Sequence, residues 1–583
     1  MLAYLASKEQ FLKDAPTIED IVKSEVKTRL NLSVGNSEYQ AWRNSLGNAM
    51  FHVMNDPAIP DDAAVAVEYR LNGRKFRIDF MISGLDESDR ESLVIVELKQ
   101  WSDIQFSDLA DHVKTFVGGA LRDERHPSYQ AWSYESHLRQ FNEYVYSNEL
   151  SVNSCAYLHN CERGNVIRDP RYVGELDKAP IFIKGELSGL RDLIKAQIKT
   201  GAGPAALERI DASPIRPSKQ LADAVGSMLK GNEEFVLLDE QKTVLEKIVN
   251  ATNESLTGQK RVLIVNGGPG TGKSVISINA LARLTSQRLN VKYVTPNAAP
   301  RAVFEAKLKK IFGKADIRSL FSGSGSFTET EKSSFDTLIV DEAHRLKMKS
   351  GMFKNLGENQ VKEIIKTAKT SVFFIDEAQK VTWSDVGEIA MIEEQAKLAG
   401  AIVERLELTS QFRCSGSDDY MAWLDETLGV GPGSTHYFSP EKFDFQIFDS
   451  PLEMHNKIKE KNKVNNKSRV VAGYCWDWIS QKRPDLKDIT IDPFGYKATW
   501  NLTSDGSEWI ISPKSVEEVG CIHTCQGLEV DYVGVIVGRD LIAIDGILKT
   551  DPSARAKTDA SLKGYKKELK EDPISAELKA DEL

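Results

Sequence analysis

A glycine-rich stretch follows a short apolar run at 261–265 and precedes a segment with helical spacing. Its residues fit the pattern GxxxxGK[ST]: Gly267, Gly268, Pro269, Gly270, Thr271, Gly272, Lys273 and Ser274. Glycines let the backbone turn its N–H groups towards phosphates, and the dipole of a following helix favours the same anion. We expect Lys273 to contact the β- and γ-phosphates of ATP and the Ser274 hydroxyl to bind Mg²⁺. A chance glycine-rich loop is disfavoured by the strand and helix around it.

A second apolar run, 337–340, ends in the carboxylates Asp341 and Glu342. In a phosphate-transfer site Asp341 would hold the Mg²⁺ shell and Glu342 would polarise the attacking water. The alternative is a strand capped by solvated acids. A third run, 371–375, leads to Gln379, which is a candidate sensor of the γ-phosphate or of the catalytic water. Glutamine is common at helix starts, so Gln379 alone decides nothing.

A separate set of acids lies nearer the N-terminus, where Asp79 follows a hairpin and Glu97 ends the next apolar strand. With Lys99 two residues later on the same strand face, they have the arrangement of the PD-(D/E)xK nucleases. The acids would bind Mg²⁺ through oxygen, and the metal with Lys99 would orient hydroxide against a phosphodiester. An acid-x-lysine strand end is common, and Asp79 lacks the preceding proline of the motif.

Two further features support this centre. Gln130 and Tyr134 lie one helical turn apart, as in the QxxxY signature that the segment resembles in RecB-type nucleases. Glu38 on an early helix is a candidate for the additional acid, with Glu25 as a rival. Core packing is the alternative for Tyr134.

The elements that position these residues are predicted from apolar periodicity. A helix at 36–50, strands at 63–71 and 75–83 around an Asn72-Gly73 turn, a buried strand at 93–98, a helix at 129–146 and strands at 155–158 and 181–183 indicate a mixed α/β N-terminal part. Short apolar strands at 261–265, 291–295, 337–340, 371–375, 468–472 and 532–537 alternate with helices and predict parallel sheets. The fold class is therefore α/β.

The domain boundaries follow composition. We predict a nuclease-like domain of the restriction-endonuclease type at 1–199 and a linker at 200–220, where Gly, Ala, Pro and Ser are frequent. A first RecA-like ATPase domain is expected at 221–410 and a second one at 411–583, incomplete at its C-terminal end. The charged tail after Asp551 is expected to be a solvated helix or a disordered end.

Length and composition add bounds. The 583 residues are 41% apolar and 27% charged, as in soluble proteins, and predict about three or four compact units. No run reaches the ~20 apolar residues of a membrane helix, and the N-terminus is a poor signal peptide, so a cytoplasmic protein without a membrane partner is expected. Six cysteines without a CxxC pair disfavour zinc or a disulfide framework. A net charge of −10 is neutral on nucleic acid, because a lined channel can differ from the average surface.

The order of the motifs resembles superfamily 1 helicases, and more closely the Schlafen group 3 type of DNA/RNA helicase. The resemblance covers about 235 to 545 and rests on Gln241, Thr295-Pro-Asn297, Asp341-Glu342, Gln379, Gln411-Phe-Arg413, 472–478, 499–502 and His523-Thr-Cys-Gln526-Gly527-Leu-Glu529. It implies that Gln241 reads the adenine edge and that Arg413 is a positive finger on the γ-phosphate. It also implies that Gly527 and Glu529 couple nucleotide to nucleic acid.

One expected motif is missing. The resemblance calls for a further arginine in a Tyr-x-x-Leu-x-Thr-Arg segment after Glu529, and the sequence to residue 583 has none. Truncation, a partner that supplies it, or weak turnover are the alternatives, since an arginine finger contributes about 10³–10⁵ in rate.

These features predict an ATP-dependent nuclease-helicase that acts on nucleic acid, with DNA favoured over RNA and anti-phage defence as the suggested setting. A partner protein or a homo-oligomer is left open. The alternatives are a nucleotide-gated nuclease that does not unwind and a non-enzymatic scaffold that binds ATP and nucleic acid. Trp476, Trp478 and Trp500 are expected either to stack on bases or to lie in the core. His112, His126 and His137 show no metal spacing and are expected to be structural.

Overall fold

The computed structural model divides the chain into two compact units, each considered by itself. Unit 1 comprises 1–219, 235–247 and 410–418; unit 2 comprises 220–234, 248–409 and 419–583. The residues that the structure describes are 2–30, 34–71, 76–109, 111–214, 218, 221–230, 232, 234–309, 317, 319–351, 356–380, 382, 384–409, 418–429, 444–481, 483–501, 506–525, 529–557, 559, 561–562 and 565–581.

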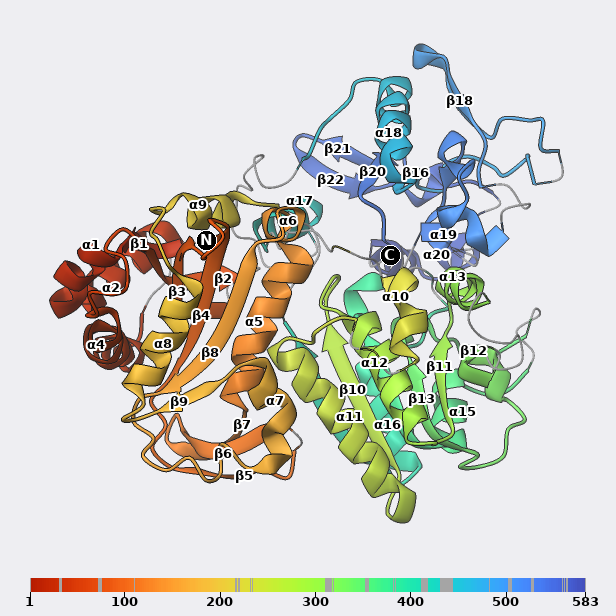
Figure 1. Ribbon diagram of the computed structural model, residues 1–583. Helices are drawn as coiled ribbons and strands as arrows, with labels where there is room; N and C mark the ends of the chain where they lie inside the picture. Colours follow the sequence, from red (N-terminus) through yellow and green to blue (C-terminus); the bar gives the residue numbers. More distant parts are fainter. Residues whose placement is uncertain are drawn as a thin grey trace. The chain divides into compact units, whose positions relative to one another are not determined.

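Unit 1 is built on a six-stranded mixed sheet in the order β1-β2-β3-β4-β8-β9 (Figure 1). The strands are β1 Leu2–Ser7, β2 Ala64–Leu71, β3 Phe76–Leu85, β4 Glu91–Lys99, β8 Ser151–Leu158 and β9 Ile181–Ile183. Strands β1 to β4 pair antiparallel, whereas β4, β8 and β9 run parallel. The strands predicted in this part of the sequence are thus present, while the turn residues Asn72 and Gly73 lie outside the described ranges.

Helices cover both faces of this sheet because its strands are apolar on both sides. The helices of unit 1 are α1 Lys8–Asp14, α2 Ile18–Leu30, α3 Asn36–Asn44, α4 Phe51–Met54, α5 Pro127–Phe141, α6 Glu143–Ser147, α7 Val173–Lys178, α8 Leu187–Gln197 and α9 Ala205–Ala212. One buried cluster joins Val94 and Val96 of β4 to Phe11 of α1 and Ile194 of α8. The cluster on the other face joins β4 to Tyr134 and other residues of α5. The predicted helix at 129–146 is divided at Asn142, which caps α6.

The stretch 200–220, which the sequence predicts to be a linker, contains helix α9 in its described part. Leu207 and Ile210, three positions apart, place one side of α9 in the same buried cluster as α5. Burial of the apolar face of α9 stabilises a helix here, although Gly and Pro are typical of flexible segments. A further small sheet of unit 1 contains β5 Ile104–Phe106, β6 His112–Val117 and β7 Ala120–Arg125.

Unit 2 contains a six-stranded sheet in the order β12-β11-β13-β14-β10-β15, with every pair parallel. The strands are β10 Arg261–Gly267, β11 Val291–Thr295, β12 Phe321–Gly323, β13 Phe335–Val340, β14 Ala368–Ile375 and β15 Ile402–Leu408. Helices α10 Leu221–Met228, α12 Lys273–Ser286, α13 Ala298–Leu308, α15 Gln360–Thr367 and α16 Ile389–Leu398 belong to this part, and α11 Asp239–Thr257 begins in unit 1. The predicted parallel sheet is confirmed. Because its strands run parallel, the loops after β10, β13 and β14 all leave the same edge.

A smaller parallel sheet follows in the order β19-β16-β20, from β16 Ser468–Ala472, β19 Val519–Gly520 and β20 Tyr532–Ile536. Next to it lie α18 Pro451–Asn465 and α19 Ile522–Cys525. This part of the chain also contains α17 Asp418–Leu428 and the pairs β17 Ile489–Ile491 with β18 Tyr496–Ala498 and β21 Leu541–Ile544 with β22 Ile547–Thr550. Two units are found where the sequence predicted three or four. Both sheets of unit 2 belong to one compact unit. Val303 of α13, which follows β11 of the larger sheet, shares a buried cluster with Trp509 and Ile510, which precede β19 of the smaller sheet.

The charged tail forms two helices, α20 Tyr565–Glu571 and α21 Pro573–Asp581. Within the described ranges, no helix has both the length and the apolar content needed to cross a bilayer.

Candidate functional site

The glycine-rich loop joins β10 to α12 at the edge of the parallel sheet. Gly272 caps α12 with φ +86°, a left-handed backbone that glycine adopts without strain. At Gly267 an added Cβ would come within 2.7 Å of Thr271 Oγ1 and 2.9 Å of Leu408 Cβ, so this close approach also requires glycine. The loop therefore presents its backbone N–H groups at the N-terminus of α12, where the helix dipole favours an anion.

Lys273 is the first residue of α12 and is 8% exposed. Its ammonium donates hydrogen bonds to the carbonyl oxygens of Gly267 and, at 2.8 Å, Gly268. It also lies 3.7 Å from Asp376 Oδ2. The positive charge is thus held inside the loop that would surround a phosphate.

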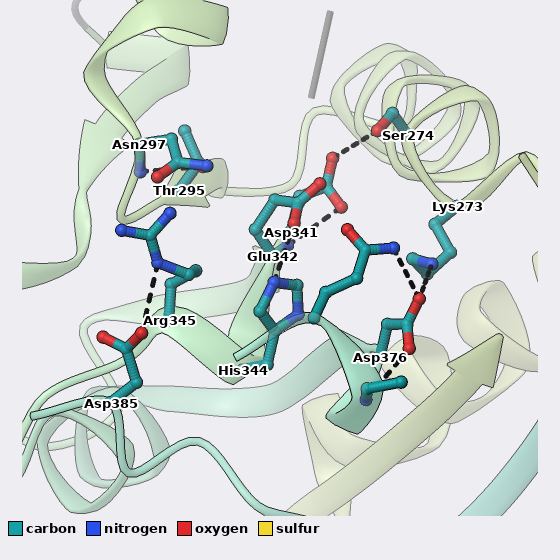
Figure 2. Close-up of polar contacts among 12 residues, drawn as sticks. Lys273, Ser274, Thr295, Asn297, Asp341, Glu342, His344, Arg345, Asp376 and Asp385 are labelled. Carbon is teal, nitrogen blue, oxygen red and sulfur yellow. Dashed lines mark hydrogen bonds and ion pairs between the residues drawn. The ribbon is translucent and has the colours of Figure 1, made fainter. Parts of the chain in front are cut away.

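Asp341 follows β13 and faces Ser274 at the start of α12 (Figure 2). Ser274 Oγ donates to Asp341 Oδ2 at 2.7 Å, and the Tyr293 hydroxyl of β11 donates to the same oxygen at 2.7 Å. Asp341 is 1% exposed, and burial followed by the neighbouring Glu342 raises its pKa. Burial and Asp341 also raise the pKa of Tyr293, so the phenol stays protonated and acts as a donor.

Glu342 and His344 form a second contact of this edge. Glu342 has φ +57°, a left-handed conformation that is strained for a non-glycine residue, and its Oε2 lies 3.0 Å from His344 Nε2. His344 is fully buried. The buried histidine therefore lies beside the carboxylate that the sequence assigned to the attacking water.

Asp376 and Gln379 come from the loop after β14. Gln379 Nε2 donates to Asp376 Oδ2 at 2.6 Å, the same oxygen that faces Lys273. Lys273, Ser274 and Asp341 thus lie at one sheet edge (Figure 2), and Gln379 joins them through its hydrogen bond to Asp376. An ammonium and backbone donors on one side and buried carboxylates on the other fit a nucleotide triphosphate with Mg²⁺.

Residues 260–581 match the family model of the Schlafen group 3 DNA/RNA helicase domain, which is more than half of the 583 residues. The chain belongs to that family. The Schlafen group 3 match confirms the predicted resemblance, and residues 260–581 form a helicase-type domain of the P-loop ATPase class. The match continues through α20 and α21, beyond residue 545 where the predicted resemblance ended.

Two other similarities are weaker. A protein of Saccharomyces cerevisiae described as uncharacterized is 23% identical over an alignment of 383 residues. The alignment covers 58% of this chain and 84% of that relative. The SWI2/SNF2 ATPase core of Sulfolobus solfataricus, solved in complex with dsDNA, is 11% identical. The aligned region covers 51% of this chain and 87% of that one, with a TM-score of 0.19. At that score the likeness supports no argument about the present chain.

The helicase resemblance also assigned roles to Gln241, Arg413, Gly527 and Glu529. Gln241, in the first turn of α11, accepts a hydrogen bond from Leu238 N at 3.2 Å and belongs to unit 1. Arg413 and Gly527 lie outside the described residues, and Glu529 precedes β20. Their assigned roles stay predictions.

The candidate nuclease centre lies where β2, β3 and β4 run side by side. Phe80 pairs with Val96, so the next position places Asp79 opposite Glu97. The β2–β3 ladder likewise places Glu68 opposite Asp79, although this pair is absent from the ladder and Glu68 has φ +54°. Directly opposite residues of antiparallel strands lie ~4.5–5.5 Å apart at Cβ. Asp79 and Glu97 are therefore neighbours on adjacent strands, and Glu68 completes a row of carboxylates because it interacts electrostatically with Asp79.

Lys99 supplies the cation of this row. Its Nζ lies 2.7 Å from Glu97 Oε1, and Leu98 N donates to Asp79 Oδ2 at 2.8 Å. Burial, followed by Asp79, raises the pKa of Glu97 to about 8, and burial also raises the pKa of Asp79. Burial by itself would lower the pKa of Lys99, but Glu97 and Asp79 outweigh it and the pKa is raised. The lysine is therefore held as an ammonium by the buried Glu97 and the half-buried Asp79.

Glu38, the candidate for the additional acid, lies on α3 beside Arg77 and Glu68. It is ion-paired with Arg77, which also lies 3.0 Å from Glu68 Oε2. Glu68 Oε1 in turn accepts from Trp42 Nε1 at 2.7 Å, and burial raises the pKa of Glu68 to about 7. Glu68, rather than Glu38, is the acid in register with Asp79. The rival Glu25 is ion-paired with Arg29 on α2.

Helix α5 and strand β7 complete the surroundings of the row. Gln130 Nε2 donates to the Tyr134 hydroxyl at 2.9 Å, as expected for side chains one turn apart. Burial and then Glu97 raise the pKa of Tyr134. The half-buried Arg125 of β7 acts electrostatically on both Glu97 and Tyr134. Within the described ranges, no group of three or more His, Cys, Asp or Glu side chains is arranged to hold a metal ion.

Sequence reasoning missed Glu68, Arg125 and Tyr293. A charged residue inside the apolar strand 64–71 was the available signal for Glu68. Tyr293 gave no signal, because a buried tyrosine in a strand usually belongs to the core.

Most of the tryptophan and histidine side chains considered from the sequence lie in or against the core, as the packing alternative predicted. Trp500 is fully buried and donates to the Trp476 carbonyl at 3.1 Å, so it is not available for base stacking. Trp476 and Trp478 are partly buried against the same core. His112 and His137 are each 2% exposed.

His126 gives unit 1 a dependence of stability on pH. It is fully buried, caps α5 through Ser128 N and contacts the Ile167 carbonyl at 2.8 Å. Burial lowers its pKa from 6.5 to about 4. Below pH 6.5 the unfolded chain takes up a proton that the folded chain refuses, so the free energy of unfolding falls as the pH falls towards about 4. Each such group contributes at most about 1.4 kcal/mol per pH unit.

We therefore expect His126→Asn, which keeps a side-chain acceptor for the α5 N-terminus, to show a shallower acid loss of stability than the unchanged protein. Urea unfolding of both proteins at about pH 7 and about pH 5 measures this difference. Equal acid losses in the two proteins would contradict the assignment.

Proposed function

We propose that the chain is a nucleic-acid-dependent ATPase whose unit 1 carries a Mg²⁺-dependent nuclease, with DNA favoured over RNA as substrate. The observation that carries the ATPase is the 2.7 Å hydrogen bond from Ser274 to the buried Asp341, beside the ammonium of Lys273. A hydroxyl and a carboxylate from two loops meet where the helix dipole and a lysine favour phosphates.

The residues of this edge divide the work of phosphoryl transfer. Lys273 would exchange its bonds to the Gly267 and Gly268 carbonyls for the β- and γ-phosphate oxygens. Glu342, held by His344, would accept a hydrogen bond from the attacking water. Mg²⁺, when bound by Ser274 and Asp341, would neutralise charge on the phosphates. Gln379 would orient the water or sense the γ-phosphate, and Asp376 keeps both Gln379 and Lys273 in place.

Residues further along the chain enter the same proposal through the family. Arg413 is proposed to place a positive charge on the γ-phosphate and Gln241 to bind the adenine edge. Gly527 and Glu529 are proposed to couple nucleotide to nucleic acid.

The nuclease proposal is carried by the register of Glu68, Asp79 and Glu97 with Lys99. Glu97 is 2% exposed and its Oε2 has no hydrogen-bond partner among the described residues, an arrangement that a cation would satisfy. Mg²⁺ commonly binds one or two carboxylates and completes its shell with water and substrate phosphate, so Asp79 and Glu97 suffice as protein ligands. Lys99 would orient the nucleophile, and Gln130 and Tyr134 would support the wall beside Glu97.

The proposed motor is tested by measuring ATP hydrolysis with and without single- and double-stranded DNA and RNA. We expect turnover that nucleic acid raises, with DNA more effective than RNA. Turnover without stimulation, together with Mg²⁺-dependent cutting, would favour a nucleotide-gated nuclease that does not unwind. If neither ATP turnover nor cutting occurs under any condition, the remaining alternative is a non-enzymatic scaffold that binds ATP and nucleic acid. A partner protein, a homo-oligomer and a role in anti-phage defence stay predictions.

A further inference from the structure

The small sheet of unit 1 contains a β-hairpin with one face that leads from solvent to the nuclease centre. In the register of β6 and β7, His112 pairs with Arg125, Lys114 with Asp123 and Phe116 with Leu121. Alternate pairs share a face, so these three pairs lie in a row on one side of the hairpin. Figure 1 shows β5, β6 and β7 together within unit 1.

The His112–Arg125 pair, at the inner end of this hairpin face, belongs to the candidate nuclease centre. Arg125 is half-buried and acts electrostatically on Glu97 and Tyr134. The neighbouring Glu124 acts in the same way on Lys99. Val113 of β6 also shares a buried cluster with Leu158 of β8, and Leu158 pairs with Lys99 of β4, so the base of the hairpin lies at the strand end that carries Glu97 and Lys99.

The outer end is apolar and exposed. The side chains of Phe116 and Leu121 are 68% and 49% exposed, although they pair with each other across the hairpin. The opposite face is anchored instead, because Val113 is fully buried in a core cluster. An exposed phenylalanine on a hairpin anchored at its base is a stacking platform for an unpaired base.

The Lys114–Asp123 pair lies in the middle of this hairpin face, and its charges determine which side of a nucleic-acid strand can lie against it. Lys114 is ion-paired with Asp108 at 3.0 Å and also faces Asp123, whose carboxylate accepts from Ser107. The exposed Arg122 points from the other face. With lysine balanced by two acids, this face does not attract phosphates and is suited to bases.

We propose that the hairpin face formed by Phe116 and Leu121 binds the unpaired bases of a single nucleic-acid strand and leads that strand into the nuclease centre. Leu121 precedes Arg125 by four residues, which is about 14 Å along a strand. The inference rests on the proposed nuclease function.

The test compares the full-length double variant Phe116→Ala/Leu121→Ala with the unchanged chain in steady-state cleavage of single-stranded and blunt duplex DNA. We expect the KM for single strands to rise about tenfold with kcat little changed, because one stacking contact is lost. Duplex cleavage is expected to change less. Phe106→Ala is the matched control, since Phe106 is an exposed phenylalanine of the same sheet on the opposite face.

An unchanged KM for single strands in the double variant would overturn the inference. A changed oligomeric state in sedimentation velocity would also overturn it, because the face would then be an interface between copies of the chain. If the unchanged chain does not cleave, the nuclease proposal fails on its own. Binding of a fluorescent single-stranded oligonucleotide then decides the inference: weaker binding by the double variant than by Phe106→Ala supports it, and equal binding overturns it.

Discussion

Lys273→Ala is expected to lower ATP turnover by about 10²–10³-fold, the size found when one preorganised donor to a developing charge is removed. The ammonium is 8% exposed and is the cation that the loop holds between its carbonyls and Asp376. The fold should persist, because water can replace the lysine at the carbonyls of Gly267 and Gly268. Initial rates of phosphate release at saturating ATP and nucleic acid measure the effect.

Lys397→Ala is the matched control, because Lys397 is an exposed lysine near the end of α16 in the same unit. It should hydrolyse ATP like the unchanged chain. Thermal unfolding of both variants separates loss of chemistry from loss of fold. Normal turnover and nucleotide affinity in a folded Lys273→Ala protein would remove the ATPase assignment of the loop.

Asp79→Asn is expected to lower Mg²⁺-dependent cleavage by on the order of 10³-fold and to leave ATP turnover unchanged, since charge stabilisation by a bound metal is worth several kcal/mol. Asparagine has the same shape and can still accept from Leu98 N, so the variant removes a charge with little effect on packing. Cleavage of end-labelled DNA with ATP present measures the first rate, and phosphate release measures the second.

Asp192→Asn, a substitution of an exposed carboxylate on α8 of the same unit, should cleave normally. Chelation with EDTA should stop cleavage by the unchanged chain, and added Mg²⁺ should restore it. If Asp79→Asn cuts as fast as the unchanged chain, the row of carboxylates is structural.

The ATPase edge could be predicted largely from sequence because its residues stand in contiguous motifs. Eight successive residues form the loop, and Asp341 and Glu342 end a strand whose apolar pattern is clear. The contacts between motifs were not predictable. The ion pair of Lys273 with Asp376 joins positions 103 residues apart, and it depends on the strand order β13-β14-β10.

The nuclease-like part shows where pattern reasoning ends. Helical position suggested Glu38, but only the strand register shows that Glu68 lies opposite Asp79. Composition suggested a linker at 200–220, while the burial of Leu207 and Ile210 makes it a packed helix. In both cases a partner distant in sequence decides the outcome, and a local pattern carries no information about that partner.

The discontinuity of unit 1 has a practical consequence for anyone who wishes to isolate it. The Tyr129 hydroxyl donates to the Leu237 carbonyl at 2.8 Å, and Lys242 Nζ lies 2.7 Å from Asp111 Oδ2. Leu238 belongs to the same buried cluster as Tyr134. A fragment cut at residue 219 would lose these neighbours and expose apolar surface, so an excised version needs to extend at least through residue 247.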